Sequence, residues 1–403
     1  MHQIQLTVDR DQLQGLLNHD EALRQLLEAL LNQVLQAEVT EHLQAEPYER
    51  TATRQGHRNG TKPRHLTTRA GTLDLLLPQV REGGFHTALF ERYQRTEQAL
   101  VVTLMEMVVN GVSTRKVLRI TEELCGKEFS KSTVSALCQQ LDPVVQAWNE
   151  RRLEAQAFPF VLVDALVIHV REDGQVRNVS ALIATGINAQ GYREILGIQL
   201  GDSESERSWG QFFGWLKDRG LHGVDFLITD DHRGLVKAAQ RHFQGVTWQR
   251  CQAHFTRNIA AAAPQALQAA IAEQVRPILT APDLATARML LNACLERFES
   301  RAPQAMQILE EGFDDATAIL VLPSGYRRRL RTTNSEERLN QELRRRERVV
   351  RIFPNRPAAI RLLGAVLLEQ HEQWTTGRKY LEMDAYHLWV AARDAIQQGG
   401  RTA

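Results

Sequence analysis

Residues 158–170 read Phe158-Pro-Phe-Val-Leu-Val-Asp164-Ala-Leu-Val-Ile-His-Val170, a mostly apolar and β-branched run with a single carboxylate near its middle. Runs of this kind predict a strand in the core of a sheet. An acid in a core strand is costly unless it is paired or holds a metal ion. Asp164 is therefore the first candidate site residue, and its partner has to come from another part of the chain.

The residues that follow predict a regular alternation of strands and helices. After a turn at Asp173-Gly174, the expected elements are a strand over 176–185, a strand over 192–200, a helix over 205–219, a strand over 224–229, a helix over 234–243 and a strand over 246–250. With the first strand and a later helix, they give the order β-β-β-α-β-α-β-α. This order predicts an α/β domain of the ribonuclease-H-like topology, in which the first and fourth strands are neighbours.

That topology places Asp230, at the carboxyl end of the fourth strand, beside Asp164. Alternation along the strand turns Asp231 to the opposite face, so Asp230 is the expected partner. Two adjacent carboxylates repel each other, and a divalent cation usually relieves the repulsion. Oxygen ligands suit Mg²⁺, with Mn²⁺ as a substitute. A third acid is expected from a helix over 334–346, which offers Glu336, Glu337 and Glu342.

Length and composition set the general class. The 403 residues include 49 Lys and Arg against 48 Asp and Glu, and 43% are hydrophobic, which predicts a globular protein of two or three domains. No apolar run approaches the roughly 20 residues of a membrane span, and the start lacks the layout of a signal peptide. Four scattered cysteines suit reduced thiols. We therefore expect a cytoplasmic protein with no membrane partner.

The local charge is less even than the total. Residues 1–50 hold nine acids against three arginines, and helical spacing of apolar residues over 23–35 predicts a face that packs either against a second helix of the same chain or against a partner, as a dimerisation or docking helix. Residues 51–95 begin with a basic stretch on turns and short strands, which suits DNA phosphates or a solvated loop. The candidate DNA-binding residues here are Arg50, Arg54, Arg58, Lys62, Arg64 and Arg69.

Residues 96–150 predict helices that resemble a helix-turn-helix. A helix that ends at Gly126 is followed by Ser130, which is expected to cap a short helix through Leu141. Short polar side chains on that second helix could approach a groove of DNA, although three packed helices without special purpose would look similar. The candidate DNA-binding residues are Arg115, Ser130, Lys131, Ser132 and Thr133.

Several motifs together resemble the Mutator-type transposases of bacterial insertion sequences, a family with an Asp-Asp-Glu site. The motifs are Gly111-Val112-Ser113-Thr114-Arg115, Val163-Asp164-Ala165, Thr229-Asp230-Asp231-His232-Arg233-Gly234-Leu235, Gln249 through Asn258, Thr333-Asn334-Ser335-Glu336-Glu337-Arg338 and Phe353-Pro354-Asn355. The resemblance implies that Asp164, Asp230 and Glu337 are the catalytic, metal-binding triad, because the Asn-x-x-Glu-Arg spacing selects Glu337.

The resemblance also implies a domain plan in which an all-α insertion splits the catalytic core. The expected segments are 1–50, acidic and helical; 51–95, basic turns and strands; 96–150, helix-turn-helix-like; 151–259, first part of the core; 260–325, helical insertion; 326–352, the core helix with the glutamate; and 353–403, a helical C-terminal region. The N-terminal region as a whole is expected to be mostly helical and to bind DNA.

Other residues have two interpretations. Cys251 and His254 have zinc-like spacing but lack a second pair nearby, and the resemblance implies instead that they support the active site, with Arg257 and Asn258 one helical turn further on. Trp209 is either a core aromatic residue or stacks on an unpaired base. Between 327 and 351, ten arginines stand against four acids, which indicates phosphate contacts rather than a solvated helix. We include Arg338, Arg344 and Arg345 among the DNA-binding residues.

The expected function is that of an insertion-sequence transposase that uses Mg²⁺ for strand cleavage and strand transfer. The resemblance implies binding to terminal inverted repeats and to target DNA, and assembly as a homodimer or larger homo-oligomer. Two alternatives remain open: a domesticated, non-catalytic DNA-binding regulator, and a ribonuclease-H-like nuclease without strand transfer.

Overall fold

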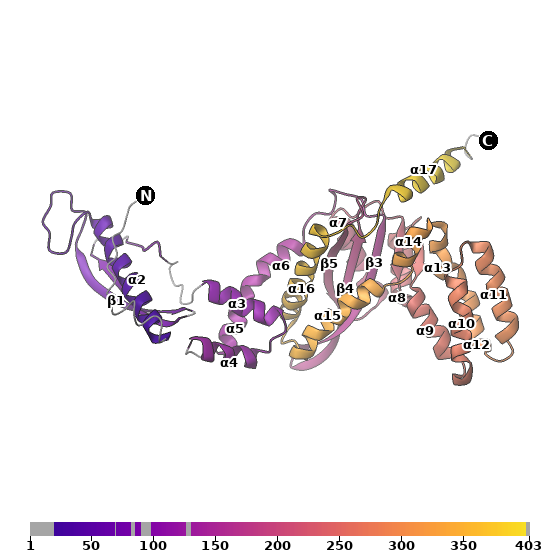
Figure 1. Cartoon of the computed structure of the whole chain (residues 1–403), viewed down its shortest axis with the longest axis horizontal. Coiled ribbons are helices and arrows are strands. Elements are labelled where there is room, and N and C mark those ends of the chain that lie inside the picture. Colours follow the sequence, from indigo (N-terminus) through magenta and orange to yellow (C-terminus); the bar gives the residue numbers. More distant parts are fainter. Residues whose placement is uncertain (1–19, 69, 82–84, 90–97, 126–129, 400–403) are drawn as a thin grey trace. The chain divides into compact units, whose positions relative to one another are not determined.

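The computed structural model describes residues 20–68, 70–81, 85–89, 98–125 and 130–399. The chain divides into two compact units, Met1–Gln139 and Gln140–Ala403, which we describe separately (Figure 1). The division falls inside the predicted segment 96–150. Gly126 and Arg69, which entered the sequence-based predictions, lie outside the described residues.

The first unit contains a long helix packed on a hairpin. Helix α2 (Asp20–Leu43) lies against strands β1 (Arg58–Thr68) and β2 (Gly71–Val80), which pair antiparallel. Leu35, Leu66, Leu73 and Leu75 form the shared core. The apolar face predicted for the acidic segment is therefore buried within the chain, against a hairpin rather than against a second helix.

Three further helices of this unit share a small core. They are α3 (Gln98–Val109), α4 (Thr114–Cys125) and α5 (Lys131–Cys138), and Leu104, Val117 and Val134 are buried between them. The Ser130 side chain accepts a hydrogen bond from the Thr133 amide at 3.1 Å, which confirms the predicted cap. The short helix continues as a 3₁₀ turn over Gln139–Leu141.

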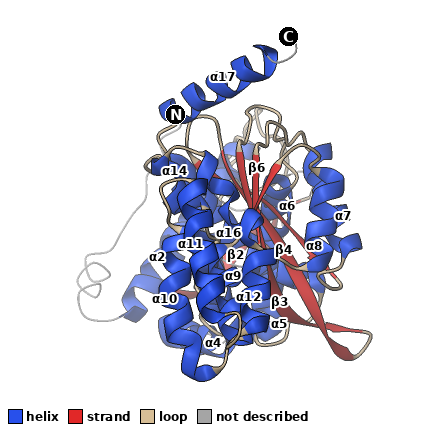
Figure 2. Ribbon diagram, turned by 90° about the vertical axis from the view of Figure 1, so that its right-hand side faces the viewer, coloured by secondary structure: helices blue, strands red, loops and turns tan. Residues whose placement is uncertain are grey.

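The second unit is built on a mixed five-stranded sheet in the order β5-β4-β3-β6-β7. Figure 2 shows strands of this sheet in red among the surrounding helices. The strands are β3 (Phe160–Glu172), β4 (Gln175–Ile187), β5 (Arg193–Gly201), β6 (Phe226–Thr229) and β7 (Thr247–Arg250). The first three pair antiparallel, whereas β6 runs parallel to β3 and β7 parallel to β6. The predicted order of strands along the chain and the adjacency of the first and fourth strands are confirmed.

Alternation along β3 divides the core into two layers. Val161 and Val163 face helices α7 (Glu206–Asp218) and α8 (Arg233–His242). Phe160 and Leu162 face the opposite side, where they pack with residues of α14 (Ser324–Leu330) and α17 (Asp384–Gly399). Asp164 continues the second series, so it belongs to the face covered by the late helices of the chain.

Residues 252–350, all of which the structure describes, form only helices and their connections. The helices are α9 (Gln252–Ala262), α10 (Gln268–Leu279), α11 (Leu284–Phe298), α12 (Pro303–Glu311), α13 (Phe313–Thr317), α14 and α15 (Asn334–Val350). Helices α9 to α13 enclose a core of their own, which includes Phe255, Ile271 and Leu309. The segment predicted as a helical insertion, 260–325, thus contains helices and no strand.

The remaining helices complete the second unit. Helix α16 (Arg356–Thr376) packs on β5 and on α6 (Asp142–Asn149), and a bidentate ion pair joins Arg361 to Asp142 at 2.6 and 2.8 Å. Among the described residues, none of the helices is both long enough and apolar enough to span a lipid bilayer.

Candidate active site

Two carboxylates from distant parts of the chain meet on neighbouring strands. In the parallel pairing of β3 and β6, Leu162 lies opposite Ile228. Asp164 and Asp230 each follow two residues later, so the same register brings them side by side at the end of β6. Asp164 Oδ1 accepts a hydrogen bond from the Ala165 amide, and its Oδ2 accepts one from Asn340 Nδ2, both at 2.9 Å.

The environment of Asp164 opposes its negative charge. The pKa of Asp164 is raised to about 6, mainly by burial and in addition by the negative charges of Asp230 and Glu204. The amide of Ala165 and the imidazole of His254 act in the opposite direction but are outweighed. A cation placed between the carboxylates would reverse this balance, because it favours the ionised form.

Asp231, the neighbour of Asp230, forms an ion pair with an arginine instead of facing Asp164. Its carboxylate lies 2.9 Å from the guanidinium of Arg250, which is 8% exposed at the end of β7. Arg250 also stacks over the ring of Phe255, at 4.6 Å from the ring centroid. Asp231 thus ties the end of β6 to β7 and α9, which favours Asp230 as the partner of Asp164.

The helix that carries Glu337 is docked directly on Asp164. Asn340, three residues after Glu337 on α15, donates the hydrogen bond to Asp164. Glu342 on the same helix is occupied by arginines, since it forms ion pairs with Arg345 at 2.9 Å and with Arg346 at 2.7 Å. This engagement favours Glu337 over Glu342 as the third acid.

The acids fit a divalent metal ion by their chemistry, because hard cations prefer carboxylate oxygens and relieve their repulsion. Among the side chains that the structure describes, no three His, Cys, Asp or Glu residues are arranged to hold a metal ion. The side chains of Glu336 and Glu337 lie outside that set. Among the described side chains, the candidate metal ligands are therefore Asp164 and Asp230, and the backbone of α15 lies beside them.

One acid near the pair was missed by the sequence reasoning. Glu204 lies in the connection from β5 to α7, half-buried, and burial raises its pKa, as does the charge of Asp230. The loop is held close because a side chain at Gly234, at the start of α8, would collide with the Glu204 carbonyl. The predicted topology could have identified Glu204. Strand β5 runs parallel to β6, so the loops that follow the two strands lie at the same edge of the sheet.

Cys251 links the end of β7 to the start of α15. Its buried Sγ accepts hydrogen bonds from the amide and hydroxyl of Thr333, both at 3.3 Å. Burial raises the pKa of the Cys251 thiol, but hydrogen bonds from His254 and Thr333 outweigh it and lower the pKa. The hydrogen bond to Cys251 raises the pKa of His254, which also interacts electrostatically with Asp164. The pair therefore connects the start of α15, through Thr333, to the surroundings of Asp164.

The other candidates of this region differ in exposure. Arg257 and Asn258 are exposed on α9. Trp209, by contrast, is 1% exposed and packs among Phe212 and Phe213 under the sheet. This burial corrects the base-stacking interpretation: Trp209 is a core residue, because no base can reach its ring in this structure.

The candidate DNA-binding residues of the first unit are mostly on its surface. Arg50 and Lys62 are exposed and Arg64 is half-buried. Arg54 donates to the carbonyls of Gly56 and Glu49, and Arg58 donates to Thr40 Oγ1 at 2.6 Å, so both also stabilise the fold. On α5, Ser130, Ser132 and Thr133 are exposed and hydrogen-bonded to one another. The side chains of Arg69, Arg115 and Lys131 lie outside the described residues.

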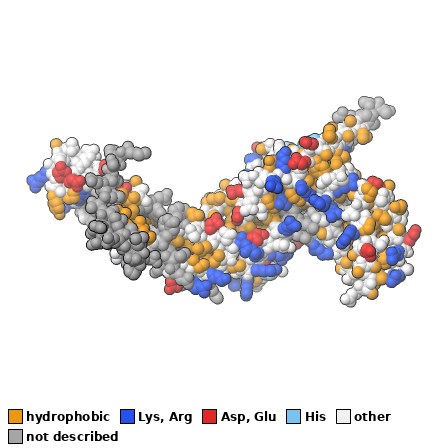
Figure 3. All heavy atoms as spheres, in the orientation of Figure 1, with side chains coloured by type: hydrophobic (Ala, Val, Ile, Leu, Met, Phe, Trp, Pro, Cys, Tyr) orange, Lys and Arg blue, Asp and Glu red, His pale blue; other side chains and the backbone are white. Residues whose placement is uncertain are grey.

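In the second unit, basic side chains gather over α14 and α15 (Figure 3). Arg338, Arg344 and Arg345 are exposed on α15, and Arg345 donates two hydrogen bonds to Glu342 at 2.9 Å. Arg346 is an exception, because it is 4% exposed and turned into the structure. The surface around the docked helix therefore carries the positive charge that the sequence places there.

Comparisons with known proteins identify the family of the chain. A family model described as "Transposase, Mutator family" matches residues 1–377. The chain is 43% identical to the transposase for insertion sequence element IS256 in transposon Tn4001 of Staphylococcus aureus, over 95% of this chain and 100% of that protein. It is 43% identical to the transposase for ISRM5 of Rhizobium meliloti, over 94% and 96% of the two chains. For the transposase for IS1081 of Mycobacterium tuberculosis, the identity is 39% over 85% and 82%. The chain therefore belongs to the Mutator family of transposases.

Proposed function

We propose that this protein is a metal-dependent DNA transposase whose catalytic acids are Asp164, Asp230 and Glu337. The observation that carries the proposal is the apposition of Asp164 and Asp230 on parallel strands, with the helix of Glu337 docked on Asp164 through Asn340. The strand order supports assignment of the domain to the ribonuclease-H-like fold. The membership in a transposase family supports DNA as the substrate.

Each part of the site has a distinct task in the proposed reaction. Asp164 and Asp230, with Glu337, would hold Mg²⁺ or Mn²⁺, which when bound activates the attacking water or 3′ hydroxyl and neutralises charge at the phosphate. Asn340 fixes the orientation of the Asp164 carboxylate. The arginines over α14 and α15 would bind the phosphates of the DNA strand and so place the scissile bond against the acids.

The first unit fits a role in recognition. Its exposed basic and short polar side chains, on the β1 hairpin and on α5, would contact the terminal inverted repeats. Two ends of a mobile element must be brought together for strand transfer, so we propose a homodimer or a larger homo-oligomer as the active form. Terminal repeats and target DNA are the two DNA partners in this scheme.

Single substitutions test the triad. Asp164→Asn, Asp230→Asn and Glu337→Gln should each reduce Mn²⁺-dependent cleavage of a supercoiled plasmid that carries the element's ends by more than about a hundredfold, while binding of the ends persists. Glu336→Gln is the matched control, because it makes the same change one residue away on α15. Retained cleavage in any of the three refutes the role of that residue, and loss in Asp231→Asn with retention in Asp230→Asn would exchange those two assignments.

The same assay separates the alternatives. A non-catalytic regulator would bind the ends but leave the plasmid intact, with or without EDTA. A nuclease without strand transfer would cut in a metal-dependent way but fail to join labelled ends to a target plasmid. Joined products that disappear in EDTA are the result that the transposase proposal requires.

A further inference from the structure

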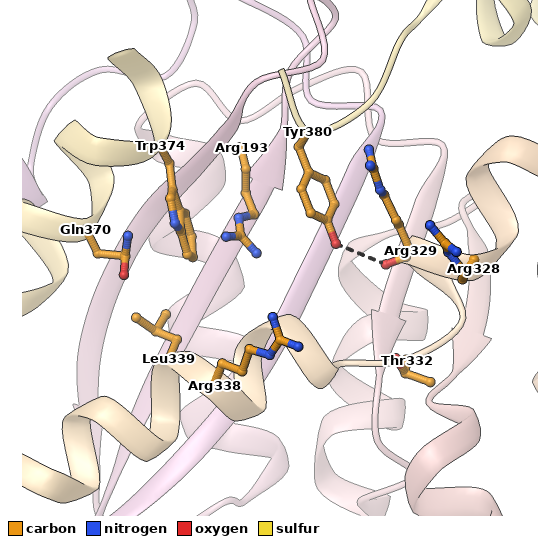
Figure 4. A pocket seen from close by; sticks show the side chains of 9 residues that line it. All are labelled: Arg193, Arg328, Arg329, Thr332, Arg338, Leu339, Gln370, Trp374 and Tyr380. Carbon is orange, nitrogen blue, oxygen red and sulfur yellow. Dashed lines mark hydrogen bonds between the residues drawn. The ribbon is translucent and has the colours of Figure 1, made fainter. Parts of the chain in front are cut away.

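A pocket of about 380 Å³ lies in the second unit, on the face of the sheet that carries Asp164 (Figure 4). Arginines and aromatic rings dominate its wall, and no carboxylate is among the described residues that line it. The residues that matter here are Arg193, Arg328, Arg329, Arg338, Trp374 and Tyr380. They come from β5, α14, α15, α16 and the connection from α16 to α17.

The arginines and rings alternate in a stack. The Arg193 guanidinium carbon lies 3.3 Å from the ring centroid of Trp374 and 4.8 Å from that of Tyr380. Arg329 lies over Tyr380 at 5.2 Å, and the Tyr380 hydroxyl donates to the Arg329 carbonyl at 3.5 Å. Figure 4 shows these four side chains side by side, with Arg338 reaching toward them from α15. The rings hold the guanidiniums in place before any ligand arrives.

The charge of the pocket calls for an anion. Arginine stays protonated in proteins, so the guanidiniums of Arg328, Arg329 and Arg338 around one cavity favour the entry of a negative group. Guanidinium groups match phosphate geometry and donate two hydrogen bonds at once. Phosphate is therefore the anionic group that this lining fits best.

The size and the aromatic walls indicate more than a phosphate. A volume of about 380 Å³ lies within the range of small-ligand pockets, and the rings and guanidinium planes offer surfaces on which a base can stack. Phosphates of an intact duplex meet protein surfaces without entering a recess, whereas a base taken out of its stack needs one. The combination fits one unpaired nucleotide.

The position of the pocket relates it to the candidate active site. Arg193 pairs across β4 with Ile187, and Ile187 pairs with Phe160, four residues before Asp164 on β3. That offset is about 13 Å along the strand. Arg338, which forms part of the wall, directly follows Glu337 on α15. A strand held at the acids could therefore place a nucleotide a few positions away in the pocket.

We propose that this pocket binds an unpaired nucleotide of the DNA end, with its base stacked against the rings and its flanking phosphates on Arg328, Arg329 and Arg338. The inference rests on the proposed DNA-processing function but concerns binding alone. It transfers to Trp374 the stacking role that the burial of Trp209 excludes.

Binding to two DNA probes tests the pocket in the absence of metal. The full-length protein is titrated in EDTA into fluorescein-labelled oligothymidylate and, separately, into an oligothymidylate–oligoadenylate duplex of the same length, and anisotropy is recorded. Trp374→Leu keeps apolar volume without an aromatic face, whereas Trp374→Phe keeps a ring. Arg328→Ala removes one charge from the wall, and Arg301→Ala removes an exposed charge from the helical insertion as the matched control.

Trp374→Leu should weaken single-strand binding by about tenfold or more and duplex binding by less than about twofold. Trp374→Phe should retain most single-strand binding, and Arg328→Ala should weaken it and lower its salt dependence, unlike Arg301→Ala. Equal effects of Trp374→Leu on both probes, or no effect on either, overturn the inference. Equal weakening of single-strand binding by Arg328→Ala and Arg301→Ala also overturns it.

The assay also separates this inference from the proposed function. If the wild type fails to cleave plasmid DNA but keeps the ring-dependent preference for single strands, the nucleotide pocket stands and the proposed reaction falls. If it cleaves but shows no ring-dependent preference, the pocket inference alone is wrong.

Discussion

Asp164→Asn tests the acid pair through stability as well as through activity. The substitution keeps one oxygen acceptor and nearly the same volume, and Asn340 can rotate its amide to present its oxygen to the new amide group. What is lost is the negative charge beside Asp230. In the wild type without metal, burial and the neighbouring carboxylates raise the pKa of Asp164 from 3.8 to about 6.

The direction of the shift fixes the sign of the effect. Because the pKa is raised in the folded state, the folded protein holds this proton more tightly than the unfolded chain between pH 3.8 and about 6. The free energy of unfolding of the wild type therefore falls as the pH rises through this window, by up to about 3 kcal/mol at about 1.4 kcal/mol per pKa unit. The asparagine variant does not titrate there, so its stability relative to the wild type should rise by that amount.

Urea unfolding in EDTA at pH 4 and pH 7.5 measures the difference. We expect the free energy of unfolding of Asp164→Asn, relative to that of the wild type, to be higher at pH 7.5 than at pH 4. We also expect Mg²⁺ at pH 7.5 to stabilise the wild type more than the variant. Asp173→Asn makes the same chemical change on a side chain that is 88% exposed in the β3–β4 turn, and it sets the background. An unchanged difference between wild type and Asp164→Asn at the two pH values would refute the reasoning.

Three further predictions concern the surroundings of the site. Cys251→Ala should lower the free energy of unfolding by about 1 to 3 kcal/mol in urea titrations, because it removes the acceptor of two Thr333 hydrogen bonds, and an unchanged value would contradict the link. Glu204→Gln should shift the acid limb of the cleavage profile to lower pH, since the charge of Glu204 raises the pKa of Asp164; a limb that stays in place excludes this coupling. Burial lowers the pKa of His371 to about 4 beside Trp148, so stability should fall by about 2 kcal/mol as the pH drops from 6.5 to 4, after allowance for partial exposure. His371→Phe should remove this fall, and a fall of equal size in the variant would assign it to other groups.

The sequence predicts the strands of the second unit well because their signals are local. Alternation, β-branched residues and turn residues such as Asp173-Gly174 mark each strand without reference to the rest of the fold. Once the order is known, the adjacency of β3 and β6 follows from topology, and with it the meeting of Asp164 and Asp230. Local pattern and topology thus suffice for two acids of the candidate site.

What the sequence could not provide are contacts that depend on tertiary placement. Trp209 and Trp374 both lie on helices with mixed composition, yet one ring is enclosed by Phe212 and Phe213 and the other lines a pocket. Nothing local distinguishes them, because burial is set by which helix face meets the sheet. Glu204 was missed for the same reason: its importance comes from a loop that Gly234 allows to approach closely.

The hydrogen bonds at the end of β7 explain how a long helical insertion can separate the acids without disturbing them. The chain leaves the sheet at Cys251 and returns at Thr333, and these two points are joined directly, by Gln252 N to the Arg331 carbonyl at 2.9 Å and by Thr333 to Cys251 Sγ. Between them, α9 to α13 bury a core of their own. Entry and exit are therefore adjacent, so the strand that ends beside Asp230 and the helix that docks on Asp164 behave as consecutive elements. The position of α15 is then fixed at its start by the contact with Cys251 and in its second turn by the hydrogen bond from Asn340 to Asp164. A substitution at either contact should therefore alter the placement of the acids, although neither Cys251 nor Asn340 is one of them.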